Sequence, residues 1–178
     1  MSTADQLTVA RAVAVPVVVA LYALDFENHF YWATAVFAVA MLTDQIDGWL
    51  ARRSGQSTDL GRILDPMADK ILVIAAMIML VPPFPGWMVA LIVAREFLVS
   101  GLRLAAIQRG IVLGARDLSK VKTWAQGLAV VIGGLAAAGA FSDDVAWWTL
   151  LVALVFTLVS GLEYALQAPS LLRGRQPA

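Results

Sequence analysis

The sequence predicts an all-α fold: a polytopic membrane protein built as a bundle of six transmembrane helices with a polar cavity open to the cytoplasm. Two observations predict this class. Sixty per cent of the 178 residues are hydrophobic, which exceeds the apolar content of an ordinary soluble domain. The apolar residues also fall into six stretches of helical length, separated by short polar turns. The chain has no cysteine, so thiol catalysis and a disulfide framework are excluded.

Six spans are expected along the chain, and residues 1–178 are predicted to form a single membrane domain. The spans cover residues 12–24, 30–53, 59–81, 87–107, 119–141 and 145–167. The proline-rich stretch over residues 82–86 cannot remain helical and predicts a tight turn. A crossing needs about 20 mostly apolar residues, and the second, third and fourth spans reach that length only with their polar ends. Those polar ends are therefore predicted to face a shared cavity instead of lipid.

The charges segregate once six spans are drawn. All thirteen Lys and Arg residues fall on one side, whereas the opposite loops carry Asp25, Glu27, Asp143 and Asp144. Basic residues concentrate on the cytoplasmic side of membrane proteins. Both termini and the polar cavity are therefore predicted to lie in the cytoplasm.

Four aspartates stand between strongly apolar flanks. Asp44 and Asp47 are spaced i,i+3, and Asp65 and Asp69 are spaced i,i+4, so each pair shares one helix face. Carboxylates crowded together repel one another and are costly to ionise in apolar surroundings. A divalent cation with a preference for hard oxygen ligands, such as magnesium, manganese or calcium, resolves both problems.

The residues beside the aspartates suit a phosphate-containing substrate. Gly48 and Ala51 leave one helix face nearly bare, so a bulky ligand can approach the backbone. Arg52 offers a phosphate a planar donor that is permanently charged. The pattern indicates metal-assisted chemistry on a phosphate, with one or two metals. The alternative is that the acids cap helices or pair with neighbouring arginines at a membrane surface.

A second group of basic residues lies at the cytoplasmic ends of the fourth and fifth spans. Arg103, Lys120 and Lys122 can converge there on a second anion, and the alternative is that they face anionic lipid headgroups. The adjacent pair Arg95 and Glu96 can neutralise itself within the membrane. Small residues over 133–139 predict close helix packing.

The spacing of the first group also matches a family signature, D-x2-D-G-x2-A-R-x8-G-x3-D-x3-D. The eight matching positions are Asp44, Asp47, Gly48, Ala51, Arg52, Gly61, Asp65 and Asp69. This pattern resembles the CDP-alcohol phosphatidyltransferases. Residues 94–103 and 120–126 resemble stretches of the phosphatidylglycerophosphate synthases within that family. Two positions differ from that pattern: Ser119 stands where those proteins have a glycine before the first lysine, and Asp5 stands near the position where they usually have asparagine.

The resemblance implies transfer of a phosphatidyl group from CDP-diacylglycerol to glycerol 3-phosphate, with CMP as the leaving group. It implies that Mg²⁺ or Mn²⁺, as two ions, is held by the four aspartates, and that Asp69 acts as general base. Gly48, Ala51, Arg52 and Gly61 would bind CDP-diacylglycerol, and Arg103, Lys120 and Lys122 the acceptor phosphate.

The expected location is a bacterial cytoplasmic (inner) membrane. Membrane lipids are expected as partners, and nucleic acid is not. A homodimer is left open as a possible oligomeric state. Two other functions stay open as well. One is a transferase of the same superfamily that uses inositol phosphate, serine or phosphatidylglycerol. The other is a non-catalytic membrane protein for metal binding or transport, although a transporter needs polar groups through both leaflets and the outer halves here are almost purely apolar.

Overall fold

The structure, a computed structural model, describes residues 3–54, 70–108 and 117–172, with side chains over 13–43, 70–106, 121–164 and at 166. All regular structure in these residues is α-helical, and they contain no β-strand. The helices are α1 (Thr3–Ala23), α2 (His29–Ser54), one over Lys70–Met79, α4 (Gly86–Gln108), α5 (Asp117–Ala137) and α6 (Asp143–Leu172). The predicted all-α class and six helices are confirmed for the described part of the chain.

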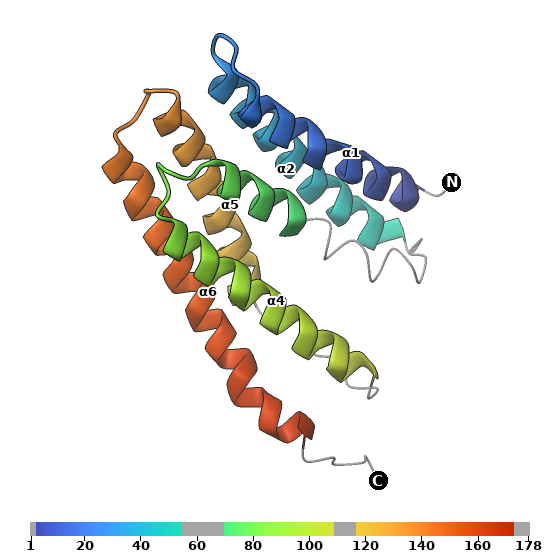
Figure 1. The fold of residues 1–178 in the computed structure, drawn as a ribbon. Coiled ribbons are helices and arrows are strands. Elements are labelled where there is room, and N and C mark those ends of the chain that lie inside the picture. The colour runs from blue at the N-terminus through green and yellow to red at the C-terminus, as the bar shows by residue number, and fades with distance from the viewer. Residues whose placement is uncertain (1–2, 55–69, 109–116, 173–178) are drawn as a thin grey trace.

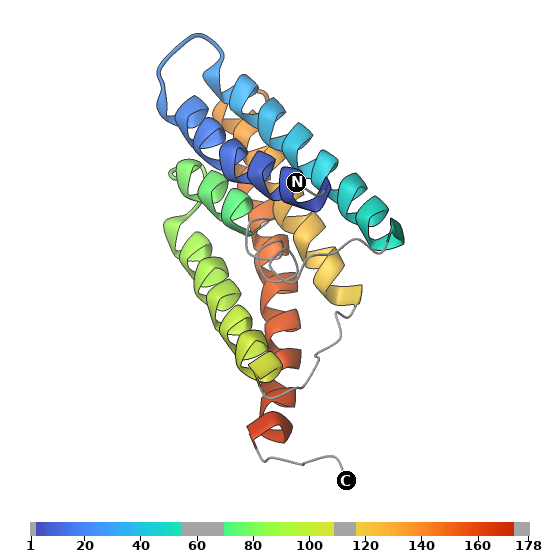
Figure 2. The ribbon, with the colours of Figure 1, turned by 90° about the vertical axis from the view of Figure 1, so that its right-hand side faces the viewer.

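The helices run back and forth along one bundle (Figures 1 and 2). The connections after α1, before α4 and after α5 lie at one end, which we call the loop end (residues 24–28, 80–85 and 138–142). The last turns of α2, α4 and α6 point toward the other end. Among the labelled helices, α5 packs against α2 and α6, α1 packs against α2, and α4 packs against α6. This order places α5 between the N-terminal helix pair and α6.

The loop-end boundaries follow from residues that cannot continue a helix. Pro82 and Pro83 lack the N–H groups that a continuing helix needs. The turn predicted over residues 82–86 is confirmed over 82–85, and Gly86 already begins α4. Helix α5 ends at Ala137, four residues before the predicted end at 141. Gly139 has φ 82° and its N–H donates to the Ala136 carbonyl, while the next N–H donates to the Leu135 carbonyl. This is the Schellman arrangement, in which a glycine with positive φ stops the helix.

A continuous apolar core fills the bundle near the loop end. Phe37, Phe84 and Met88 are fully buried in it. The glycine at 133 makes room for the Phe84 ring, because a Cβ added at Gly133 would lie 2.4 Å from the ring's Cζ. A Cβ at Gly134 would lie 2.0 Å from the Thr34 hydroxyl oxygen. The predicted close packing through small residues is therefore confirmed for this part of α5.

The outer surface is apolar where the interior is charged. On α4, Phe97 and Leu98 are each 69% exposed, whereas the preceding Arg95 and Glu96 are 7% and 2% exposed. Soluble proteins rarely expose large contiguous apolar surface. Among the described residues, one stretch, Asp143–Tyr164 of α6, is both long and apolar enough to cross a membrane, and the other apolar helices are shorter.

Candidate active site

Helix α2 carries the first half of the predicted metal site. It is continuous to Ser54, so Asp44 and Asp47 lie on one helix with i,i+3 spacing, as predicted. Gly48 and Ala51 follow on the same helix, together with Arg52. The helical backbone brings these positions together along one face, which is the arrangement that a cation between carboxylates requires. Gly61, Asp65 and Asp69 lie outside the described residues.

A largely buried group of charged and polar side chains connects three helices, and we call it the charged layer. It consists of Lys70, Arg95, Glu96, Lys122 and Gln126. Glu96 lies at its centre, because its Oε1 accepts hydrogen bonds from Arg95 Nη1 at 2.8 Å, from Gln126 Nε2 at 3.4 Å and from Lys122 Nζ. The ammonium of Lys70 lies 3.3 Å from Glu96 Oε2.

Helix α6 accepts hydrogen bonds from the charged layer. Arg95 Nη2 donates to the Ser160 hydroxyl at 2.6 Å, and Gln126 Nε2 donates to the Thr157 hydroxyl at 2.8 Å. A Cβ at Gly161 would lie 2.8 Å from Arg95 Nε, so the glycine leaves room for the guanidinium stem. The sequence alone did not predict these α6 contacts, since Ser160 and Thr157 stand in an otherwise apolar run.

Lys70 is the layer's most exposed cation. Its side chain is 27% exposed, compared with 8% for Arg95 and 6% for Lys122. It also donates a 2.6 Å hydrogen bond to the Ser100 hydroxyl, one turn after Glu96 on α4. Sequence reasoning did not single out Lys70 as a site residue, although it directly follows Asp69 in the signature.

Arg103 lies on α4 beyond the charged layer. Its Nη2 donates to the Tyr164 hydroxyl at 2.8 Å, and its Cζ lies 5.6 Å from the centroid of that ring. Of the three bases predicted for the acceptor, Arg103 and Lys122 have different partners. Lys120 lies in the first turn of α5, and its side chain is not described.

Among the side chains that the structure describes, three cations contact the carboxylate of Glu96. They are Lys70, Arg95 and Lys122. A buried charge is costly unless it is paired, and each of these charges has a partner of opposite sign. The predicted pairing of Arg95 with Glu96 is confirmed, but the pair is not self-contained, because Glu96 also binds two lysines.

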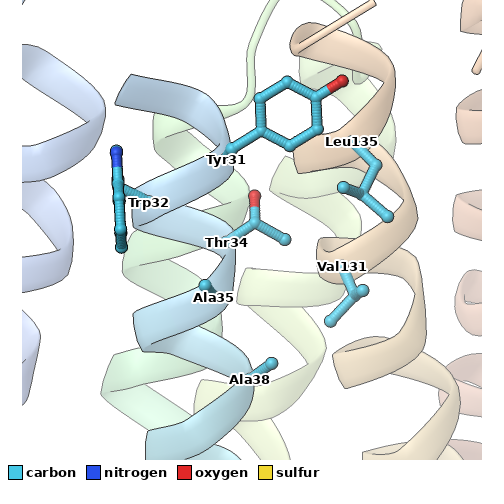
Figure 3. A pocket seen from close by; sticks show the side chains of 7 residues that line it. All are labelled: Tyr31, Trp32, Thr34, Ala35, Ala38, Val131 and Leu135. Atoms are coloured by element: carbon cyan, nitrogen blue, oxygen red, sulfur yellow. The ribbon is translucent and has the colours of Figure 1, made fainter. Parts of the chain in front are cut away.

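An apolar groove lies elsewhere in the bundle, between α2 and α5 (Figure 3). It has a volume of about 410 Å³ and is lined by Tyr31, Trp32, Thr34, Ala35, Ala38, Val131 and Leu135. No charged side chain lines it, and the Thr34 hydroxyl already donates to the Phe30 carbonyl at 2.7 Å. The groove lies near the start of α2, whereas Asp44 and Asp47 lie in its second half. It offers packing surface and no group for metal or phosphate chemistry.

Comparisons with known proteins show the family to which the chain belongs. The sequence model of the CDP-alcohol phosphatidyltransferase family matches residues 1–159, and the chain belongs to this family of transferases. It is 38% identical to the CDP-diacylglycerol–glycerol-3-phosphate 3-phosphatidyltransferase of Bacillus subtilis (strain 168), over 90% of this chain and 91% of that protein. The enzyme of the same name from Pseudomonas fluorescens is 37% identical, over 90% and 83% of the two chains. A probable phosphatidylglycerophosphate synthase of Mycobacterium tuberculosis (strain ATCC 25618 / H37Rv) is 36% identical, over 93% and 80%.

Proposed function

We propose that this protein transfers the phosphatidyl group of CDP-diacylglycerol to glycerol 3-phosphate, giving phosphatidylglycerophosphate and CMP in phospholipid biosynthesis. The observation that carries this proposal is similarity along about nine-tenths of the chain to relatives named for this reaction. The basic residues Arg103 and Lys122 support an acceptor that is itself an anion. Free serine, an acceptor in the same superfamily, lacks a phosphate.

The four aspartates are proposed to hold one or two Mg²⁺ or Mn²⁺ ions. The donor set fits, because carboxylate oxygens are the ligands that these hard cations prefer and Asp44 and Asp47 share a face of one continuous helix. A metal bound there would draw charge from the diphosphate of CDP-diacylglycerol and so favour departure of CMP. The other two ligands of the proposed set are Asp65 and Asp69.

The chain's own residues bind the donor and move a proton. Gly48, Ala51 and Gly61 leave space for the cytidine nucleotide, and Arg52 contacts its phosphates. The acceptor hydroxyl attacks the phosphorus that bears the lipid, its proton passes to Asp69, and the bond from that phosphorus to the CMP oxygen breaks. The carboxylate of Asp69 must therefore lie within hydrogen-bond reach of that hydroxyl.

The acceptor phosphate is proposed to bind Arg103, Lys120 and Lys122. Charge-assisted hydrogen bonds from these bases to a dianion are stronger than bonds between neutral groups. Lys122 is 5% exposed and bound to Glu96, so it contributes to the field at the site from a fixed position. Arg103 is held by Tyr164, and its planar guanidinium offers further N–H donors of the kind that bind a phosphate.

The bundle is proposed to span a membrane, with both termini and the site facing the cytoplasm; in a bacterium this is the inner membrane. The apolar outer faces of α4 and α6 support a lipid environment around a polar interior. The loop end supports the orientation, because its described residues include Asp25 and Glu27 and neither lysine nor arginine. A site at the inner leaflet lets the diacylglycerol tails of the donor remain in the bilayer.

The test is CMP release by the purified protein with CDP-diacylglycerol, Mg²⁺ and one acceptor at a time. Glycerol 3-phosphate should support release, and the product should be phosphatidylglycerophosphate. Inositol phosphate, serine and phosphatidylglycerol serve as competing acceptors. Faster release with any of these three would replace the proposed acceptor, and no release with all four would remove the proposed activity.

A further inference from the structure

Arg103 of α4 and Tyr164 of α6 make two contacts with each other. Arg103 Nη2 donates to the Tyr164 hydroxyl at 2.8 Å, and Arg103 Cζ lies 5.6 Å from the centroid of the same ring. The hydrogen bond fixes one nitrogen, and the attraction between a cation and an aromatic ring holds the guanidinium beside the ring. Together the two contacts restrict how the guanidinium can turn more than either contact would alone.

Helices α4 and α6 do not need this pair of residues in order to pack. The bond from Arg95 to the Ser160 hydroxyl already joins them, and the two helices lie against each other. Apolar side chains would join two helices at a smaller desolvation cost than a guanidinium. Tyr164 is 9% exposed and Arg103 is partly exposed, so the tyrosine supplies a fixed support for a side chain that solutes can reach.

The described residues leave one donor of Arg103 without an acceptor. Its Nε is buried and has no hydrogen-bond partner among the residues that the structure describes. A buried donor without an acceptor is costly, and an oxygen of a bound anion would supply one. A planar guanidinium binds a phosphate through two N–H groups along one edge, so the orientation of its plane decides whether the phosphate can bind.

We propose that Tyr164 is a positioning residue for the acceptor: its hydroxyl and its ring hold the Arg103 guanidinium in the orientation that binds the phosphate of glycerol 3-phosphate. The inference rests on the proposed function, because it takes Arg103 as a ligand of the acceptor phosphate. Tyr164 contacts no substrate in this role and acts through Arg103. An arginine that is held before its ligand arrives loses less conformational freedom on binding, which favours affinity.

The experiment measures the Michaelis constants of the purified full-length protein from initial rates of CMP release. Tyr164→Phe removes the hydroxyl and keeps the ring, so the constant for glycerol 3-phosphate should rise by about three-fold. Tyr164→Leu removes both contacts and should raise it by about ten-fold. The constant for CDP-diacylglycerol and the turnover number should keep their original values in both variants. A rise in the constants for both substrates would show a general loosening of the bundle and would overturn the positioning role.

A double-mutant comparison tests whether Tyr164 acts through Arg103. In a chain that already carries Arg103→Ala, Tyr164→Phe should cause no further rise in the constant for glycerol 3-phosphate, because residues that act as one unit are not additive. The same rise in both backgrounds would mean that Tyr164 acts without Arg103, and the proposal would fail.

A matched control is Tyr22→Phe. Tyr22 is also buried, and its hydroxyl lies 3.1 Å from the Thr34 hydroxyl in the core near the loop end. The same atom is removed, so the melting temperature should fall while both Michaelis constants stay unchanged.

Arg103→Ala tells the two proposals apart. If Arg103→Ala raises the constant for glycerol 3-phosphate and neither Tyr164 variant does, only the positioning role fails. If Arg103→Ala keeps the original constant, Arg103 does not bind the acceptor phosphate, and both proposals for this residue fail.

Discussion

Helices α4 and α6 each carry a buried apolar residue and, about two turns further along, a buried polar or charged residue. On α4, Met88 is fully buried in the apolar core, whereas Glu96 is 2% exposed in the charged layer. On α6, Leu150 and Thr157 are both fully buried, and again one is apolar and the other hydrogen-bonded. Burial is equal in the two regions, so burial alone does not separate packing residues from candidate site residues.

The difference lies in what each region requires of its neighbours. Apolar side chains such as Phe84 need only space, which Gly133 provides. Buried charges need partners, because an unpaired charge in a low-dielectric interior is very costly. The charged layer, together with the Ser160 and Thr157 hydroxyls that accept its hydrogen bonds, draws on four helices. Among the described side chains, three cations contact the carboxylate of Glu96. We infer that the apolar core fixes the bundle and the charged layer serves the reaction.

The largest effect should follow removal of a carboxylate from the proposed metal site. Asp65→Asn should abolish CMP release at every Mg²⁺ concentration, because an amide is a poorer ligand for a hard divalent cation than a carboxylate. The fold should be intact, as judged by helical circular dichroism. Near-normal activity across a magnesium titration would contradict the metal-site proposal.

The next largest effect should come from the centre of the charged layer. Glu96→Gln leaves Lys70, Arg95 and Lys122 without their carboxylate, and breaking a buried pair in this way costs about 3–5 kcal/mol. Lys70→Met should cost less stability, since Glu96 keeps two cations. Thermal unfolding in detergent compares the two variants. Equal melting temperatures would show that Glu96 does not hold the layer together.

A moderate and selective effect is expected at the acceptor bases. Arg103→Ala and Lys120→Ala each remove charge-assisted hydrogen bonds worth about 1.5–3 kcal/mol. The Michaelis constant for glycerol 3-phosphate should rise by about ten-fold or more, and that for CDP-diacylglycerol should change much less. Initial rates at varied concentrations of each substrate measure both constants. If both variants keep the original constant for glycerol 3-phosphate, these bases face lipid headgroups.

The smallest effect on the reaction is expected in the apolar core. Phe84→Leu leaves part of the space beside Gly133 empty and should lower stability by about 1 kcal/mol or more. Both Michaelis constants should keep their original values, because Phe84 lies among apolar side chains. The same unfolding and rate measurements provide the check. A selective rise in the constant for glycerol 3-phosphate would show that the two regions are not separate.

Local sequence patterns predicted the helices and the register of the signature. Apolar runs and prolines placed most helix boundaries within a few residues, and the i,i+3 spacing of Asp44 and Asp47 is realised on one helix. The early end of α5 was missed because Gly139 is one small residue among several, and only its positive φ shows that it stops the helix.

The partners of the charged layer could not be predicted from local patterns. Lys70 and Glu96 are 26 residues apart and belong to different helices, and Arg95 reaches Ser160 across 65 positions. Such pairs depend on how the helices rotate and shift against each other in the bundle. The sequence showed only that Arg95 and Glu96 are adjacent, which predicted that these two charges neutralise each other without further partners.

The loop end and the signature are proposed to face opposite sides of a membrane, with the reaction on the cytoplasmic side. The chain has no cysteine, so single cysteines can be introduced without a background signal. Glu27→Cys and Asp143→Cys should react with a membrane-impermeant maleimide added to intact cells, and Gln56→Cys should react only after the cells are opened. Labelling of Gln56→Cys from outside, with Glu27→Cys protected, would contradict this orientation.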